Sequence, residues 1–457
     1  MNNKRVPFIL LFFSAILGNL ALLYPAILSW LVFFYLIPIF YLAFTQPYAL
    51  SFKAGFFWGV IFFLIHLSGF VFLFYEQANS ALSIIIPIII SAYFALYTGV
   101  WFFLASHTAC VFKHSITSTI VSWTIWTYLY ITWMRYGSLW IFGKFVGYPF
   151  SYPLLPLAHN AKMLYFLRFC PKSIGVFLII LFSLFIALFF SFLKKRHLLL
   201  AIATLVPFLY GTVVVPEKQS TPEAIKKIGY ISPIKAQKYN HPIDVAQEIF
   251  YSMVTLIEKK PNIKVIVMPE SSYTFFLNER QDMIDMWYAN ALDDDISLFI
   301  GAPYRDGKKI YNSLYWIKGG RIQNVYHKTN LMAFTEYISS FWQKVPYIKN
   351  LFIDGDDWLS HGKDCLITFD LCKQIKLKPL ICSDFFIGKR KMGKQLTKDN
   401  FSAALIIVND QAFPVKYLRD LMFLSAKLEA VNRQKDMLYV GYYFAAWINK
   451  SGSVLIL

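Results

Sequence analysis

Charge is scarce in this chain of 457 residues. Charged residues make up 15% of it and hydrophobic residues 57%, whereas a soluble protein of this size needs more charge on its surface. The shortage is concentrated in the first half, which is nearly all apolar, and most charges follow residue 215. The composition therefore predicts one part of the chain in lipid and another in water.

Cysteine is also scarce, which excludes two further classes of protein. The five cysteines include no CxxC pair, so the sequence indicates neither a disulfide framework nor a zinc site. Cys365 and Cys372 are spaced so that a short hairpin would bring them together, or they remain two free thiols. No internal repeat and no low-complexity segment is present.

Acidic residues are fewer than basic ones, 26 against 44, which gives a net charge of +18. Such an excess is found in nucleic-acid-binding proteins. It is also found in membrane proteins, whose cytoplasmic loops are basic and face anionic headgroups. The long apolar runs favour the membrane, and no nucleic-acid partner is expected.

Apolar runs of roughly 17 to 25 residues, each long enough to cross a hydrocarbon core, occur seven times before residue 215. They lie at 6–23, 25–45, 54–75, 81–104, 116–134, 174–193 and 197–214. We interpret the first run as a membrane helix and not a cleavable signal peptide, because further apolar runs follow at once. The sequence thus predicts a helix bundle over 1–215, with a long outer loop near 135–173.

Basic residues indicate how this bundle is oriented. Those at 4–5, 53, 113 and 194–196 fall on one side of the predicted bundle, and the opposite short loops carry none. The long loop 135–173 breaks this pattern with five basic residues, and its length gives it less weight. Positive loops face the cytoplasm, so the N-terminus is expected inside. With an odd number of spans, everything after residue 215 is expected outside the cytoplasm.

After residue 225 the pattern changes to short β-branched runs that alternate with polar helical stretches. This alternation predicts an α/β domain over 216–457 with buried sheets. Strands are expected at 227–231, 264–268, 296–300, 310–317, 322–326, 375–381, 404–408, 438–443 and 445–449, and helices at 245–259, 281–292 and 416–433.

Three reactive residue types follow strands of this domain, where α/β folds tend to place functional groups. Glu270 ends Val-Ile-Val-Met-Pro-Glu and is poorly solvated there, which suits a general base or equally a helix cap or salt bridge. Lys328 ends Val-Tyr-His-Lys and is either an oxyanion stabiliser or a surface lysine. Cys382 follows Pro-Leu-Ile and is either a buried thiol or a nucleophile whose thiolate a nearby cation and base favour.

Taken together, Glu270, Lys328 and Cys382 occur in the order and spacing that resembles the nitrilase, or carbon–nitrogen hydrolase, superfamily. With the bundle in front, the chain resembles the apolipoprotein N-acyltransferase family over nearly its whole length. Further segments support the resemblance: Pro-Glu-Ser at 269–271, Lys-Thr-Asn-Leu-Met-Ala-Phe-Thr-Glu at 328–336, Asn-Asp at 409–410, and 143–149 in the long loop.

The resemblance implies a fold, a reaction and a set of residue roles. The fold is a membrane helical bundle of about seven spans with a nitrilase-like αββα sandwich domain. Glu270 would be the general base, Lys328 the oxyanion stabiliser and Cys382 the nucleophile. Substrate-binding or supporting roles fall to Glu336, Asp384, Ser383, Tyr239 and Asn409. The family uses no metal and no cofactor.

The implied reaction transfers an acyl chain from a membrane phospholipid, through a Cys382 thioester, to the N-terminal amine of diacylglyceryl-cysteine in apolipoproteins. The enzyme would be a multi-pass, monomeric protein of the bacterial inner membrane, with its catalytic domain on the periplasmic side. Aromatic loops such as 337–342 would dip into the lipid interface, or pack as ordinary loops.

The sequence departs from the family at several positions. Ala333 and Thr335 replace a Pro and a Gly, Asp384 stands where Glu is common, and Asn432 falls where another Glu is expected. Family members usually continue into a final membrane helix beyond the position of Leu457.

Two other functions fit parts of the sequence. A membrane-anchored amidase of the same superfamily would use water in place of the amine. A transporter or receptor would carry ionisable residues inside its spans, but no Asp, Glu, Lys or Arg lies within the seven runs, and His66 and His107 lie within or near them.

Overall fold

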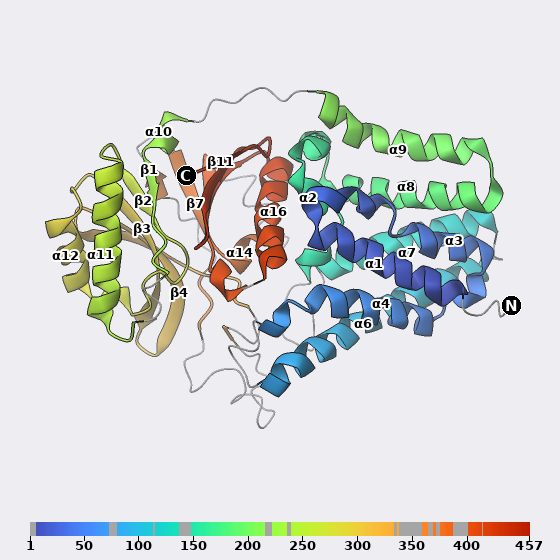
Figure 1. The fold of residues 1–457 in the computed structure, drawn as a ribbon, viewed down its shortest axis with the longest axis horizontal. Helices are drawn as coiled ribbons and strands as arrows, with labels where there is room; N and C mark the ends of the chain where they lie inside the picture. The colour runs from blue at the N-terminus through green and yellow to red at the C-terminus, as the bar shows by residue number, and fades with distance from the viewer. Residues whose placement is uncertain are drawn as a thin grey trace. The chain divides into compact units, whose positions relative to one another are not determined.

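A computed structural model describes residues 6–72, 80–112, 115–136, 148–214, 222–234, 239–332, 336–337, 359–363, 369–371, 375–386, 401–413 and 415–457. The chain forms two compact units. One consists of Met1–Gly137, Gly147–Pro216 and Phe413–Asn432, and the other of Ser138–Val146, Glu217–Ala412 and Arg433–Leu457. Figure 1 shows helices in the first unit and two sheets in the second.

The first unit is a helix bundle. Its longer helices are α1 (Val6–Leu23), α3 (Ile37–Thr45), α4 (Phe52–Leu67), α6 (Ser80–Val111), α7 (Ile116–Tyr136), α8 (Lys172–Phe192), α9 (Lys195–Val213) and α16 (Lys416–Arg433). Its short elements are α2 (Pro25–Leu28), η1 (Ser29–Phe33), η2 (Pro47–Ala49), η4 (Pro149–Ser151), η5 (Pro156–His159) and η6 (Ala161–Arg168). Helix α16 joins this unit although strands of the second unit precede and follow it in the sequence.

The described helices that are long and apolar enough to cross a membrane lie in this bundle, as the sequence predicts. Five described stretches are long and apolar enough to cross a membrane: Val6–Leu23, Pro25–Thr45, Ser83–Val111, Lys172–Phe192 and Lys195–Val213. The predicted run 54–75 corresponds to the shorter apolar helix Phe52–Leu67. The predicted run 116–134 forms α7, whose many Ser, Thr, Trp and Tyr side chains lower its hydropathy. The number of seven spans stays a prediction.

The predicted single span at 25–45 is broken into three pieces, α2, η1 and α3. Proline stands in the first turn of both α2 and α3. A proline lacks the backbone N–H and disfavours a helical residue before it, so it starts helices and ends the preceding one. The run is therefore apolar throughout but not one helix.

Small residues let the membrane helices approach closely. A Cβ on Gly55 of α4 would lie 2.5 Å from the backbone oxygen of Thr98 in α6, and one on Gly59 would lie 2.8 Å from the Cα of Ala95. The Thr98 hydroxyl donates a hydrogen bond of 2.7 Å to the Gly55 carbonyl oxygen. Close backbone approach and interhelical hydrogen bonds are the interactions that usually stabilise helix–helix contacts in lipid.

The bundle contains a buried charge cluster that fixes α16. Glu429 of α16 is 2% exposed and accepts from Arg135 of α7 at 2.8 Å and from Lys172 of α8 at 2.5 Å. The Arg135 guanidinium also stacks over the Tyr152 ring at 4.2 Å. Since removing one partner of a buried ion pair leaves an uncompensated charge, these contacts tie α16 to the ends of α7 and α8.

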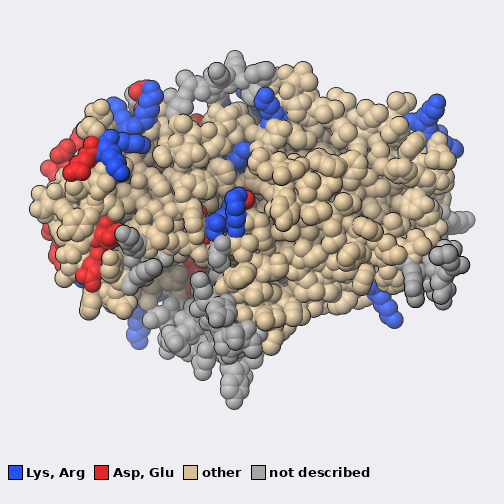
Figure 2. Space-filling view, viewed as in Figure 1, with Lys and Arg blue, Asp and Glu red and all other residues tan. Residues whose placement is uncertain are grey.

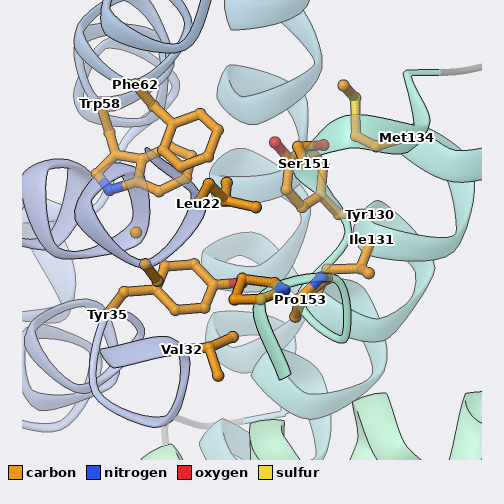
Figure 3. A pocket seen from close by; sticks show the side chains of 13 residues that line it. Leu22, Val32, Tyr35, Trp58, Phe62, Tyr130, Ile131, Met134, Ser151 and Pro153 are labelled. Carbon is orange, nitrogen blue, oxygen red and sulfur yellow. The ribbon is translucent and has the colours of Figure 1, made fainter. Parts of the chain in front are cut away.

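A small pocket lies inside the bundle (Figure 3). Aromatic side chains surround it, with Trp58 and Phe62 coming from α4 and Tyr130 from α7. Its described lining belongs entirely to the helical unit and includes none of the predicted catalytic residues.

The second unit contains two mixed sheets. The first has the strand order β1-β2-β3-β4-β5; its strands are Ile228–Tyr230, Val265–Val267, Ser297–Asp306, Lys309–Lys318 and Arg321–His327. Strands β1, β2 and β3 are parallel, and β3-β4-β5 is an antiparallel meander. The second has the order β11-β10-β9-β8-β7-β6; in chain order β6 to β11 are Phe369–Leu371, Ile375–Ile381, Ala403–Ile407, Asp436–Val440, Ala445–Ile448 and Val454–Ile456.

Helices α11 (Pro242–Lys259) and α12 (Gln281–Asn290) cover the first sheet. Ile249 and Met253 of α11 and Trp287 of α12 are fully buried in one core with Ile266 and Leu298 of the sheet. The shorter helical pieces of this unit are α10 (Glu223–Lys226), η8 (Leu277–Glu279), α14 (Ser383–Phe386) and η10 (Asp410–Ala412). The two sheets are joined by the Tyr442 hydroxyl, which donates to the Ser271 carbonyl oxygen at 2.9 Å.

The predicted fold class, apolar helices in the first half of the chain and an α/β domain after them, is confirmed. The predicted domain bounds 1–215 and 216–457 remain a prediction, and α16, which lies within the second range, belongs to the helical unit. Figure 2 shows Lys, Arg, Asp and Glu gathered over the α/β unit and sparse over the visible surface of the helices. Such an apolar surface suits lipid and not water.

Candidate active site

The candidate active site lies where four strands of the α/β unit end. Glu270 follows β2, Lys328 follows β5, Cys382 follows β7 and Asn409 follows β8. Strands β7 and β8 are parallel neighbours with Ile381 opposite Ile407, so their carboxyl ends bring Cys382 and the 409 region to the same edge.

Lys328 stands between two carboxylates. Its Nζ donates to Glu270 Oε1 at 2.9 Å and to Glu336 Oε1 at 2.9 Å. The Asn312 amide donates to the same two oxygens, at 2.8 and 3.0 Å. The other carboxylate oxygens accept from backbone N–H groups, Glu270 Oε2 from Asn409 at 2.7 Å and Glu336 Oε2 from Met332 at 2.8 Å. Both carboxylates are therefore fixed in position on both oxygens.

The charge on Lys328 is maintained by these carboxylates. The side chain is 1% exposed, and burial alone would lower its pKa. Glu270 and Glu336 outweigh burial and hold the pKa of Lys328 well above its usual value. A permanent ammonium at this point can stabilise a negatively charged oxygen as it forms.

Cys382 sits at a strained elbow between β7 and α14. Its φ is +44°, a left-handed conformation that costs a non-glycine residue free energy and is typical of functional sites. Its N–H donates to the Ile407 carbonyl oxygen at 2.8 Å. The turn thus carries the thiol off the end of the strand, as nucleophile elbows do.

The surroundings of Cys382 favour its protonated thiol. Burial, the Glu270 charge and the hydrogen bond to Glu270 raise the pKa of Cys382 well above its usual value, and Lys328 lowers it only in part. The sequence could not show that two carboxylates surround this thiol. A protonated thiol requires a base to become a nucleophile, and Glu270 is hydrogen-bonded to it.

Asp384 connects the Cys382 elbow to the loop that carries Lys328. Its carboxylate accepts from the N–H of Thr329 at 3.1 Å, of Asn330 at 2.7 Å and of Ile381 at 3.2 Å. The Tyr326 hydroxyl donates to it at 2.9 Å. Burial raises the pKa of Asp384, and Lys328 and the hydrogen bonds oppose that rise. The Ser383 hydroxyl adds a bond to the Asn330 carbonyl oxygen.

We expect Asp384→Asn to loosen this connection. The carboxylate oxygen that accepts from Ile381 and Tyr326, or the one that accepts from Thr329 and Asn330, would become an amide NH₂ and leave buried donors unpaired. Each unpaired donor costs about 1–3 kcal/mol, and a shift of about 1 Å at a catalytic group lowers rates on the order of 100-fold. Thermal unfolding and acyl transfer would be measured beside exposed Asp282→Asn; unchanged values for both would contradict this role.

The turn that carries Glu270 requires a glycine beside it. Ser271 has a φ of +58°, and a Cβ on Gly301 of β3 would lie 2.5 Å from the Pro269 carbonyl oxygen and 2.7 Å from the Glu270 Cα. Backbone atoms at these distances cannot rotate away, so a side chain at 301 would displace Glu270.

Gly301→Ala is therefore expected to lower stability by about 1–3 kcal/mol and to reduce turnover. Gly307→Ala is the matched control, because its φ is +58° but no atom lies within 4 Å of the added Cβ. Gly307→Ala should lose stability because alanine disfavours a positive φ, but it should keep its turnover because the added Cβ contacts nothing. Denaturant unfolding and acyl transfer on both variants would check the result, and equal turnover in the two would overturn it.

Comparisons with known proteins find relatives by sequence and by fold. No family model matches the chain. An apolipoprotein N-acyltransferase from Aquifex aeolicus is 27% identical over 212 residues, which cover 43% of this chain and 46% of the relative. One from Rhizobium etli is 39% identical over 182 residues, which cover 38% of this chain and 32% of the relative. The chain is similar in sequence to apolipoprotein N-acyltransferases.

The apolipoprotein N-acyltransferase named 2 from Treponema denticola is 25% identical over 191 residues, covering 37% of this chain and 36% of the relative. The chain thus matches less than half the length of these curated relatives. The resemblance predicted from the sequence is confirmed at that level.

Solved structures of carbon–nitrogen hydrolases are also similar. A superfamily protein from Xanthomonas campestris, with an arsenic adduct in its active site, has a TM-score of 0.33 at 13% identity and covers 48% of this chain and 82% of that one. A carbon–nitrogen hydrolase from Helicobacter pylori has a TM-score of 0.34 at 12% identity and covers 48% of this chain and 80% of that one.

Some of the predicted site residues lie away from this cluster, and others are not among the residues that the structure describes. Tyr239 is 38% exposed and takes no part in the hydrogen-bonded group. Predictions for 143–147, 333–335, 338–342, Cys365 and Cys372 fall outside the described residues. Among the residues described, no three His, Cys, Asp or Glu side chains are placed to hold a metal ion.

Two members of the cluster were missed in the sequence analysis, Asn312 and Tyr326. Asn312 bonds both carboxylates and Tyr326 bonds Asp384. Asn312 is a polar residue within the apolar strand Lys309–Lys318, which is a signal, but its partners come from distant segments that only the fold brings near.

Proposed function

We propose that this chain is an acyltransferase that moves an acyl chain from a membrane phospholipid to the N-terminal amine of diacylglyceryl-cysteine in apolipoproteins, through a thioester on Cys382. One observation carries the proposal: a buried thiol at a strained elbow, hydrogen-bonded to a carboxylate that Lys328 neutralises. The apolar helices of the same chain support a lipid substrate.

In the first half-reaction Glu270 takes the proton of the Cys382 thiol as the sulfur attacks the sn-1 ester carbonyl of the phospholipid. The carbonyl oxygen becomes negative beside the Lys328 ammonium. The ester C–O bond then breaks, and Glu270 gives its proton to the leaving lysophospholipid. The acyl chain remains on sulfur.

In the second half-reaction the amine attacks the thioester carbonyl and transfers a proton to Glu270. The C–S bond breaks, an amide is formed, and the proton returns to the sulfur. This is a ping-pong scheme. Glu336, which shares Lys328 and Asn312 with Glu270, keeps the lysine charged while Glu270 is protonated.

The same proposal includes a location. The basic residues on one side of the predicted bundle support an inner-membrane enzyme whose α/β unit works on the periplasmic side. Labelling single introduced cysteines at the loops from outside whole cells would test that orientation.

The decisive experiment separates the two half-reactions. The purified full chain is mixed with a phospholipid carrying a labelled sn-1 acyl chain, and Cys382 peptides are analysed by mass spectrometry. We expect the acyl mass on Cys382, and its transfer to a diacylglyceryl-cysteine peptide added afterwards. Release of free fatty acid in place of transfer would favour an amidase-like hydrolase, and an unlabelled Cys382 would reject the proposal. The exposed Cys110, replaced by alanine, is the matched control.

A further inference from the structure

An unsatisfied acceptor lies next to the general base. The Asn409 side-chain oxygen is shielded from solvent and has no hydrogen-bond partner among the described residues. The backbone N–H of the same residue donates to Glu270 Oε2 at 2.7 Å. Buried acceptors without a donor are costly and rare in native proteins, so this oxygen needs an explanation.

The segment that holds Asn409 is rigid. Asp410, which follows it, is fully buried and accepts from the Tyr442 N–H at 2.6 Å. A Cβ on the neighbouring Gly441 would lie 2.4 Å from the Asp410 carboxylate, so the close packing leaves little room for movement. Val408, on the other side, donates to the Val440 carbonyl oxygen at 2.9 Å. Asn409 therefore cannot turn its backbone to find another partner.

The chemistry of the two substrates decides what this oxygen can bind. The reacting ester of the donor lipid offers only acceptor oxygens, whereas the reacting amine of the second substrate offers N–H donors. Asn409 lies two residues beyond Ile407, the strand end whose carbonyl oxygen accepts from the Cys382 N–H, and its own N–H bonds the base that must take the amine proton.

Resting on the proposed function, we infer that Asn409 is the residue that binds the attacking amine. Its side-chain oxygen accepts an N–H of the amine and directs the nitrogen lone pair at the thioester carbon. A second N–H then faces Glu270, which takes the proton as the C–N bond forms and the C–S bond breaks. Asn409 thus acts in amide formation and not in loading of the acyl chain.

The test measures both half-reactions on the full chain in phospholipid nanodiscs. In Asn409→Ala we expect amide formation with a diacylglyceryl-cysteine peptide to slow roughly 10- to 100-fold, because the variant loses one hydrogen bond to the polar substrate. The KM for the peptide should rise. Acylation of Cys382 should change less than about threefold. Asn409→Asp retains an acceptor and should recover part of the aminolysis. Asn290→Ala, at the exposed end of α12, is the matched control.

The possible outcomes are distinguishable. A wild-type chain that never acquires an acyl group on Cys382 rejects the proposed function itself. Equal slowing of both half-reactions in Asn409→Ala, or no slowing, overturns this inference and leaves the proposed function intact. Donor lipids with and without an amine headgroup are compared, because loss of acylation only with the amine headgroup would assign the oxygen to the donor lipid and overturn the inference as well.

Discussion

Replacing Cys382 with serine is expected to lower acyl transfer by on the order of 10⁴-fold or more, the size of effect seen when a nucleophile is removed from a catalytic group that acts as a unit. Serine keeps the size of the side chain, but its hydroxyl is far less acidic than a thiol and forms a poorer leaving group than sulfur. Transfer of labelled acyl chain to a diacylglyceryl-cysteine peptide measures the loss.

The fold should survive this change. Serine fits the space of the buried cysteine and meets the same backbone φ of +44°, so the thermal unfolding temperature should move by only a few degrees. Cys170→Ser, at a partly buried free cysteine of the helical unit, is the control and should keep its activity. A Cys382→Ser variant that transfers acyl chains at the wild-type rate would end the assignment of the nucleophile.

Replacing Lys328 with methionine should reduce transfer by roughly 10²- to 10³-fold, the usual effect of removing one oxyanion-stabilising group. It should also cost about 3–5 kcal/mol of stability, because Glu270 and Glu336 would then face each other without the ammonium that both contact at 2.9 Å. The acyl-enzyme would form slowly even in protein that remains folded.

The same variant gives a signal that a purely structural lysine would not. Lys328 lowers the pKa of Cys382, so its removal raises that pKa further and leaves less thiolate at any given pH. Each unit of pKa reduces the thiolate tenfold, and iodoacetamide should alkylate Cys382 more slowly in Lys328→Met than in the wild type. Faster alkylation in a folded variant would contradict the electrostatic role.

A double variant separates stability from catalysis. Adding Glu336→Gln to Lys328→Met removes one of the two uncompensated carboxylates and should recover part of the unfolding free energy. The rate of transfer should remain low, because the ammonium that we propose as the oxyanion stabiliser is still missing. Recovery of turnover in the double variant would mean that Lys328 acts through folding alone.

Much of the α/β unit could be predicted because periodicity and strand ends are local properties. The strand 375–381 and the helix 416–433 were predicted with the bounds that the structure has. Each of the three reactive residues could be singled out because it follows a strand, but their grouping came from the family resemblance, since Glu270 and Lys328 follow strands of one sheet and Cys382 follows a strand of the other. The three-residue strands Phe369–Leu371 and Val454–Ile456 were missed.

The parts that escaped prediction depend on contacts between distant segments. The raised pKa of Cys382 depends on its burial and on which charges surround it. Among the described residues, six hydrogen bonds to Asp384 come from Tyr326, Thr329, Asn330 and Ile381. The break within 25–45 depends on prolines in an otherwise uniform apolar run. The prediction followed the hydropathy of the run and did not take these prolines into account.

The position of α16 has a consequence for dissecting the protein. The polypeptide leaves the α/β unit after Ala412, contributes a helix to the bundle and returns at Arg433. A fragment that begins at 217 would therefore retain a helix whose buried Glu429 had lost both Arg135 and Lys172. The α/β unit should be insoluble or misfolded when expressed alone, since the two units are interleaved along the chain and cannot be separated by a cut at a single linker.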